Sequence, residues 1–221
     1  MKRFFRLLSL VFFSIASFAQ NNGTLEFLGI PIDGPIEQMY DALGEKGFEK
    51  VWYSDYMTGV FNGENVHVYF STNHGIVDKV RVEYPYYSEE NEVRVKYNVL
   101  LSRFNRNAKY ICVIPHAEVS SDENIRGEVS LNSKSYEAIY FYLNPGLDGK
   151  AWVEGFKQEY LRRYKKPLEG LSYEEMEEAL FCLPAEVSDA VIGVVWFTIV
   201  NANWININYV NFRNRPRGED L

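Results

Sequence analysis

The side chains that could act as metal ligands are few and widely separated in this sequence. Its three histidines are His67, His74 and His116. A zinc site needs three or four ligands that converge on one point. No two of these histidines stand two or four residues apart, the spacing that places side chains on one face of a strand or helix. We therefore expect independent surface histidines, no metal and no other cofactor.

Side chains that could act as nucleophiles or acids also fail to indicate a catalytic site. No serine stands in a Gly-x-Ser-x-Gly elbow. Cys112 and Cys182 have apolar neighbours and lack the electropositive setting of a reactive thiol, so they are either two buried thiols or one disulfide. The acidic run at 174–178 is typical of a solvated helix face. Catalytic carboxylates meet only in the folded chain, so a hydrolase acting on glycan or peptidoglycan stays an alternative.

The segment LGIPIDGPIEQMYDALGEKGF, residues 28–48, is the stretch that most resembles a ligand-binding loop. A phosphate loop needs a glycine run followed by lysine and a hydroxyl, whereas prolines interrupt this segment and acidic residues flank it. Asp33 or Gly34 is a suitable helix cap, and Pro35 suits the first turn. The segment therefore predicts an extended stretch that turns into a helix.

Tyrosines are concentrated on one predicted strand. Along 136–143, Tyr136, Ala138, Tyr140 and Tyr142 share a face because side chains alternate along a strand. An exposed face of this kind could stack sugars or dock a protein. If a helix covers it, it belongs to the core, and we favour the core.

Asparagines mark the last predicted strand. Alternation over 204–212 places Asn206 and Asn208 on one face with Val210, and the other face holds Ile205, Ile207 and Tyr209. We expect both amides to face solvent and to serve recognition, because asparagine cannot act as an acid or base near neutral pH. The alternative is that a helix covers them and that they are buried and paired.

A basic run at 162–166 stands out in an acidic chain. Cations are favoured at a helix C-terminus by the helix dipole, which explains the run without a ligand. An anionic headgroup or an acidic patch of a partner is the alternative.

The elements that would position these side chains are of both kinds. Apolar residues at helical spacing predict helices, and alternating runs predict strands, joined by the hairpin dipeptide Asn62-Gly63 and next by a turn at 73–75. Ser172 and Glu175 predict a capping box at one helix start. The expected helices cover about 35–43, 88–104, 150–166 and 172–181, and the expected strands cover about 25–30, 51–61, 64–70, 77–84, 110–114, 125–131, 136–143, 190–200 and 204–212. We predict an α+β fold with antiparallel sheet and helices packed on one face.

Two segments of the chain are similar to each other, which raises the question of an internal duplication. PIDGPIEQMYDAL at Pro31–Leu43 is similar to PLEGLSYEEMEEAL at Pro167–Leu180. A single domain over 20–221 or a duplicated helix-plus-meander unit, with sub-units 20–107 and 108–221, are the two organisations to test.

The first nineteen residues predict export. A basic start, an apolar run from Leu7 to Phe18 and small residues at Ser17 and Ala19 form a secretory signal, with cleavage expected before Gln20. The run is too short to span a membrane. No cysteine follows the cleavage point, so a lipoprotein is not expected. The remaining chain is expected in the periplasm or outside the cell, with no transmembrane segment.

Net charge narrows the partners further. The whole chain carries a formal charge of −7, and removing the basic leader makes it more negative. Such a chain repels nucleic acid and anionic lipid on average, so no nucleic-acid partner is expected. The oligomeric state stays open.

Three stretches, FLGIPIDG, TGVFNGENVHVYFSTN and VVWFTI…NINYVNFRNRPRGEDL, resemble a group of uncharacterised secreted proteins of Bacteroidetes that carry FLGIPIDG, FNG and GEDL in the same order. This resemblance implies export from a Gram-negative cell and a shared fold. It implies no site residue. More distantly, the helix-plus-meander pattern is similar to the β-lactamase inhibitor protein and to small lipoproteins of outer-membrane assembly.

These expectations together favour a binding role. We expect a non-catalytic periplasmic or surface module that engages a protein or an envelope polysaccharide. A hydrolase and a purely structural envelope component are the alternatives.

Overall fold

A computed structural model describes residues 23–168 and 171–214. The expected signal peptide at 1–19 and the terminal GEDL stretch lie outside the described residues. Both stay predictions.

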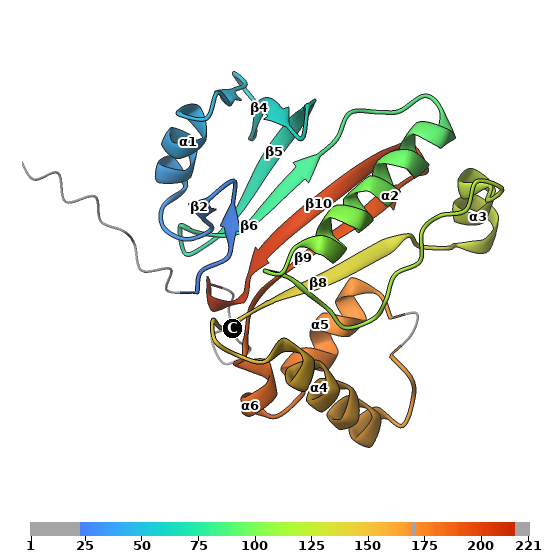
Figure 1. Cartoon of the computed structure of the whole chain (residues 1–221). Coiled ribbons are helices and arrows are strands. Elements are labelled where there is room, and N and C mark those ends of the chain that lie inside the picture. Colours follow the sequence, from blue (N-terminus) through green and yellow to red (C-terminus); the bar gives the residue numbers. More distant parts are fainter. Residues whose placement is uncertain (1–22, 169–170, 215–221) are drawn as a thin grey trace, which may run out of the picture.

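One antiparallel sheet of eight strands organises the fold (Figure 1). Its order is β3-β4-β5-β6-β10-β9-β8-β7, so two four-stranded meanders join where β6 pairs with β10. The strands are β3 (Glu49–Lys50), β4 (Tyr56–Phe61), β5 (Glu64–Asn73), β6 (Ile76–Glu83), β7 (Ile111–Cys112), β8 (Glu137–Leu143), β9 (Val191–Val200) and β10 (Trp204–Asn211). A separate hairpin consists of β1 (Glu26–Phe27) and β2 (Ile30–Pro31). The predicted α+β class with antiparallel sheet is confirmed.

Helices lie on both faces of the sheet, whereas the sequence led us to expect them on one. The helices are α1 (Ile36–Gly44), α2 (Glu90–Arg106), α3 (Ile125–Asn132), α4 (Gly149–Tyr164), α5 (Tyr173–Phe181), α6 (Ala185–Ser188) and a 3₁₀ turn at Phe212–Asn214. Residues of α1, α2 and α3 join one apolar core, and residues of α4 and α5 join a second. Along β8, Tyr140 belongs to the first core and Phe141 to the second. The physical reason is that β8 and β9 are apolar on both faces, so each face needs a cover.

The two similar segments, Pro31–Leu43 and Pro167–Leu180, occupy different positions in the order of strands and helices. Helix α1, in the first segment, precedes β3, whereas α5, in the second, lies between β8 and β9. The pairing of β6 with β10 joins strands from both expected sub-units, 20–107 and 108–221, in one sheet.

Local signals were confirmed at two turns and a helix start. Asn62 and Gly63 have φ of 53° and 85° in the β4–β5 turn. The capping box of α5 is present: Glu175 N–H donates to the Ser172 hydroxyl, and Ser172 N–H donates to the Glu175 carboxylate. His74 also occupies a turn, with φ of 48°. These predictions depend on neighbours within three residues, which the sequence shows directly.

Three local expectations were wrong: the type of one element, the start of one strand and the cap of one helix. The segment expected as a strand at 125–131 is helix α3, which begins at Asn124, whose side chain accepts a hydrogen bond from Gly127 N–H. Residues 51–55 form a loop before β4 rather than the start of a strand. Helix α1 is capped by Pro35 without a side-chain hydrogen bond, not by Asp33 or Gly34.

Within the described part of the chain, no helix combines the length and the apolar character that crossing a bilayer requires. This agrees with the expectation for these residues.

His116 completes the hydrogen bonding of β8 where β7 has ended. The two strands pair only at Ile111 and Cys112, and the next free N–H, that of Ile139, donates to His116 Nε2 at 2.9 Å. His67 and His74 are exposed as expected. The expectation was wrong for His116, which is half-buried and bonded.

Burial lowers the pKa of His116, so protonation should destabilise the fold. The unfolded chain takes up this proton near pH 6.5 while the folded chain resists it, so stability is complete above roughly pH 6.5 and declines as the pH falls below it. We expect the urea midpoint to fall between about pH 7 and pH 5, and His116→Gln, which does not titrate, to flatten that slope. Equal slopes in the two proteins would show that His116 is not the titrating group.

Candidate functional site

The second face of the sheet is only partly covered. The apolar core under α4 and α5 contains residues of β8, β9 and β10 but none of β4, β5 or β6. The side chains that these three strands direct to that face are half-exposed or exposed. We call this surface, with the adjoining part of β9 and β10, the open face. Its residues are Tyr56, Thr58, His67, Tyr69, Arg81, Glu83, Trp196, Thr198, Asn206 and Asn208.

Strand register arranges the open face in two rows that cross five strands. Cα pairing gives one row of Tyr56, Tyr69, Arg81, Asn208 and Trp196, and a second of Thr58, His67, Glu83, Asn206 and Thr198. Neighbouring strands lie about 4.8 Å apart, so each row is a continuous strip of side chains. Residues from 56 to 208 are brought together by the pairing of β6 with β10.

Planar groups on β4, β5 and β6 contact one another. The Tyr56 ring centroid lies 4.4 Å from that of His67 and 5.2 Å from that of Tyr69. The Arg81 guanidinium lies 4.2 Å from the centroid of the Tyr69 ring, a cation–π contact. Burial, followed by the neighbouring Glu83, raises the pKa of Tyr69, so its hydroxyl stays protonated near neutral pH. These contacts hold the four planar groups in place before any partner binds.

The N-terminus of α5 borders the other end of the open face. Tyr173 stacks on Trp196 with ring centroids 4.6 Å apart, and Tyr173 N–H donates to the Glu137 carboxylate. The Trp196 indole N–H and the Asn206 side-chain oxygen are covered and have no hydrogen-bond partner among the described residues. Buried polar atoms are normally paired, so these two are exceptions in this part of the sheet.

Exposed aromatic residues flank the open face. Trp52 is 87% exposed and Tyr53 is 104% exposed, in the loop immediately before Tyr56. Sequence reasoning missed both because VWYSDY was assigned to a strand. The available signal was three aromatic residues within five positions, next to Ser54 and Asp55, which favour turns.

A cleft lies at the opposite edge of the same surface. Tyr86 and Trp204 have ring centroids 6.2 Å apart and line a cleft of about 340 Å³, together with Asn65, His67 and Glu83. Tyr84 and Pro85 complete the lining, which therefore combines aromatic rings with groups that can form hydrogen bonds. This is the combination that recognises polar ligands with apolar faces, such as sugars.

No family model, no curated protein and no solved structure matches the chain. The resemblance to secreted Bacteroidetes proteins therefore stays a resemblance, and we infer function from the geometry of the described residues.

The tyrosine face lies in the core rather than on the surface. Tyr140 is 0% exposed and Tyr136 is 6% exposed. Tyr142 is half-buried and packs beside the first core. The favoured core interpretation agrees with this burial, and an exposed binding ladder at Tyr136 and Tyr140 is wrong. Phe104 of helix α2 packs on this face, with its ring centroid 5.1 Å from that of Tyr140, and Figure 1 shows α2 over the neighbouring strands β9 and β10.

Asn206 and Asn208 lie on the open face, as alternation predicted, but only one of them is accessible. Asn206 is half-exposed, whereas Asn208 is 2% exposed. The expectation that Asn208 faces solvent was wrong. Asn208 lies directly between Arg81 and Trp196, whose larger side chains stand on either side of it.

The two cysteines are free thiols rather than a disulfide. Cys112 is half-buried, and burial raises the pKa of its thiol to about 11, which leaves it unreactive near neutral pH. Cys182 is exposed, contrary to the apolar setting expected from sequence. No group of three histidine, cysteine or acidic side chains suited to a metal ion occurs among the residues that the structure describes.

Proposed function

We propose that this chain is an exported binding module that holds a protein partner on its open face. The observation that carries this proposal is the preformed cluster of Tyr56, His67, Tyr69 and Arg81 on an uncovered sheet. Tyrosine, tryptophan and arginine supply most of the energy at protein interfaces. Side chains that already contact one another lose less freedom on binding, which favours affinity.

Charge on the open face supports a protein rather than a uniformly charged polymer. Arg81 and Glu83 stand two residues apart on β6. Glu137 on β8 pairs with Thr198, the last residue of the second row. A mixed pattern of this kind matches a partner with complementary charges and gives specificity. The export signal proposed from residues 1–19 would place this binding in the periplasm or outside the cell.

A polysaccharide is the second candidate, and the Tyr86–Trp204 cleft favours it. Two aromatic rings can stack on sugar rings, and Glu83, His67 and Asn65 can bond to hydroxyl groups. Trp204→Ala should abolish capture of a polysaccharide partner. It should leave nearly unchanged the capture of a protein that binds at the cluster around Tyr69.

The open-face proposal predicts the effect of a double change at Tyr69 and Arg81. A partner captured from envelope extracts by the mature chain is identified, purified and titrated against wild type and Tyr69→Ala/Arg81→Ala. We expect the affinity to fall by about a hundredfold or more, since each hot-spot truncation costs about 2 kcal/mol or more. Calorimetric titration measures the loss.

The control is Leu161→Ala, which removes a 56% exposed side chain on α4, away from the open face. It should bind the partner as wild type does, and both proteins should keep their melting temperature within a few degrees. A partner that binds the double variant normally would refute the open face as its site. Hydrolysis of an envelope glycan that is lost on changing one carboxylate would refute the binding role itself.

A further inference from the structure

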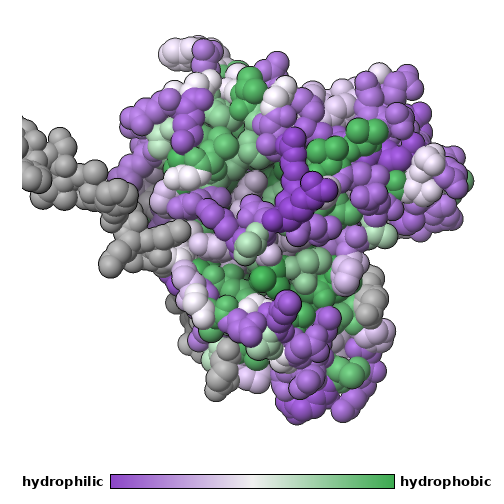
Figure 2. Space-filling model, viewed as in Figure 1, coloured by the Kyte–Doolittle hydropathy of each residue, from purple (hydrophilic) through white to green (hydrophobic). Residues whose placement is uncertain are grey.

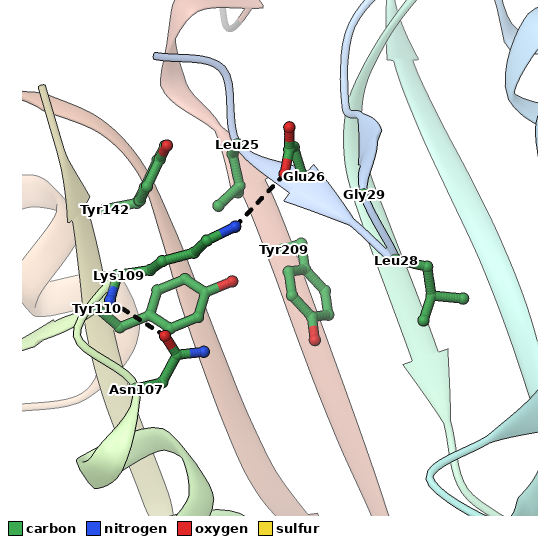
Figure 3. A pocket seen from close by; sticks show the side chains of 9 residues that line it. All are labelled: Leu25, Glu26, Leu28, Gly29, Asn107, Lys109, Tyr110, Tyr142 and Tyr209. Atoms are coloured by element: carbon green, nitrogen blue, oxygen red, sulfur yellow. Dashed lines mark hydrogen bonds and ion pairs between the residues drawn. The ribbon is translucent and has the colours of Figure 1, made fainter. Parts of the chain in front are cut away.

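A second pocket lies on the opposite side of the sheet from the open face. It has a volume of about 210 Å³ and is bounded by the β1–β2 hairpin, the segment after α2, and the side chains of Tyr142 and Tyr209 (Figure 3). Tyr209 belongs to the core under α2, whereas its neighbour Asn208 faces the open face. Figure 2 shows this side of the molecule, where hydrophilic residues predominate and apolar residues gather in the hollows between them.

The hydroxyl of Tyr209 is the most informative group in this pocket. The residue is 5% exposed and lines the pocket, and no hydrogen bond joins its hydroxyl to another described residue. Burial raises its pKa well above the usual value, so the hydroxyl stays neutral and can donate. The hydroxyl is not among the fully covered side-chain atoms that lack a partner, so it is accessible from the pocket and free to bond a molecule there.

Other polar groups converge on the same space. Figure 3 shows the Tyr110 hydroxyl directed toward Tyr209. Burial, with Tyr142 and Glu26 nearby, raises the pKa of Tyr110 to about 12. The Asn107 side-chain oxygen accepts from Lys109 N–H at 3.1 Å, which leaves the amide N–H groups of Asn107 as donors.

Charge at the rim of the pocket is balanced. Lys109 Nζ reaches across to the Glu26 carboxylate at 3.6 Å (Figure 3). An anion would meet the Glu26 carboxylate and a cation would meet the Lys109 ammonium, so neither is favoured. The raised pKa values of Tyr110 and Tyr209 keep these two phenols neutral, so they add no charge to the interior.

We propose that this pocket binds a small neutral polyol of the monosaccharide class. Phenol hydroxyls and an amide can exchange hydrogen bonds with ligand hydroxyls, and the Tyr110 and Tyr209 rings can pack on the C–H faces of a sugar ring. The pocket is smaller than the roughly 300–1,000 Å³ typical of drug-sized ligands, which suits one ring and excludes a chain. It is a separate site from the open face and does not depend on the function proposed there.

The test is calorimetric titration of the mature chain with glucose, galactose, mannose and N-acetylglucosamine. We expect at least one of them to bind at a single site, with saturation by ~10 mM. Tyr209→Phe removes only the hydroxyl and should weaken that binding about tenfold or more, because the ligand loses its buried partner. The melting temperature without sugar should stay unchanged, because this hydroxyl bonds to no described residue.

Two controls separate this site from others. Tyr84→Phe removes a buried hydroxyl that is bonded to Asn62 outside the pocket, and it should leave the sugar affinity unchanged. Trp204→Ala, in the cleft at the edge of the open face, should also leave the sugar affinity unchanged, so failure here and failure of the open-face proposal give different results. The proposal is overturned if none of the four sugars binds, if Tyr209→Phe binds as wild type does, or if Tyr84→Phe weakens binding equally.

Discussion

Tyr140→Ala should lower the free energy of unfolding by about 3–5 kcal/mol, the usual cost of truncating a buried aromatic residue. Tyr140 is 0% exposed. Its ring is stacked on Phe197 with centroids 6.0 Å apart and lies 5.1 Å from the ring of Phe104. The hydroxyl donates to Asn105 Oδ1 at 2.8 Å. The change therefore removes core packing and a hydrogen bond together, and urea unfolding measures the loss.

Two controls divide this cost. Tyr140→Phe keeps the ring and removes only the hydrogen bond, so it should cost about 1 kcal/mol. Tyr69→Ala truncates a tyrosine on the open face, where less packing is lost, and should cost clearly less than Tyr140→Ala. An unchanged urea midpoint for Tyr140→Ala would show that the tyrosine face is not packed under α2, and its role as a binding surface would have to be reconsidered.

Features with local causes could be predicted from the sequence. Alternation placed Ile205, Ile207 and Tyr209 on one face of β10, and all three lie in the first core. The Asn62-Gly63 turn and the Ser172 capping box depend on adjacent residues, so no knowledge of the fold was needed.

Features with distant causes could not be predicted. Helix α3 owes its start partly to Glu90, whose carboxylate accepts from Ile125 N–H across 35 residues of sequence. The open face exists because Arg81 pairs with Asn208, and nothing in either local segment indicates that pairing. Sequence alternation identifies the two sides of a strand but not which side a helix will cover. This is why Asn208 could be placed on the correct face and still be misjudged as exposed.

One missed feature did have a local signal. The run VIGVVWF in β9 is apolar at consecutive positions, which indicates a strand buried on both faces. Val194 belongs to the second core and Val195 to the first. This run alone was sufficient to predict helices on both faces of the sheet.

Glu64→Ala should lower the free energy of unfolding by about 2–3 kcal/mol, because it leaves a buried ammonium without its carboxylate. The Lys96 side chain is 10% exposed, and its Nζ lies 2.6 Å from Glu64 Oε1. The Tyr87 hydroxyl donates to the other carboxylate oxygen of Glu64. The figure is below the roughly 3–5 kcal/mol of a fully buried pair because the Glu64 side chain is 34% exposed.

The same pair predicts a loss of stability in acid. Burial raises the pKa of Glu64, but the hydrogen bonds from Lys96 and Tyr87 lower it more, and the net shift is downward. The stabilisation is therefore complete above the unfolded pKa of about 4.3 and is lost as the pH falls below it. Glu64→Ala should remove this part of the acid dependence, which urea midpoints measured from about pH 6 to pH 3 would show.

The paired change Glu64→Leu/Lys96→Met separates the cost of an unpaired charge from the value of the pair. Removing both charges is often neutral, so the double variant should recover most of the stability lost in Glu64→Ala. If it is as unstable as Glu64→Ala, the loss comes from packing between β5 and α2 rather than from the bare Lys96 ammonium. The pair joins β5 to α2, on the side of the sheet opposite the open face. A double variant that regains its stability should therefore bind an open-face partner as wild type does, whereas Tyr69→Ala/Arg81→Ala should stay folded and lose that partner.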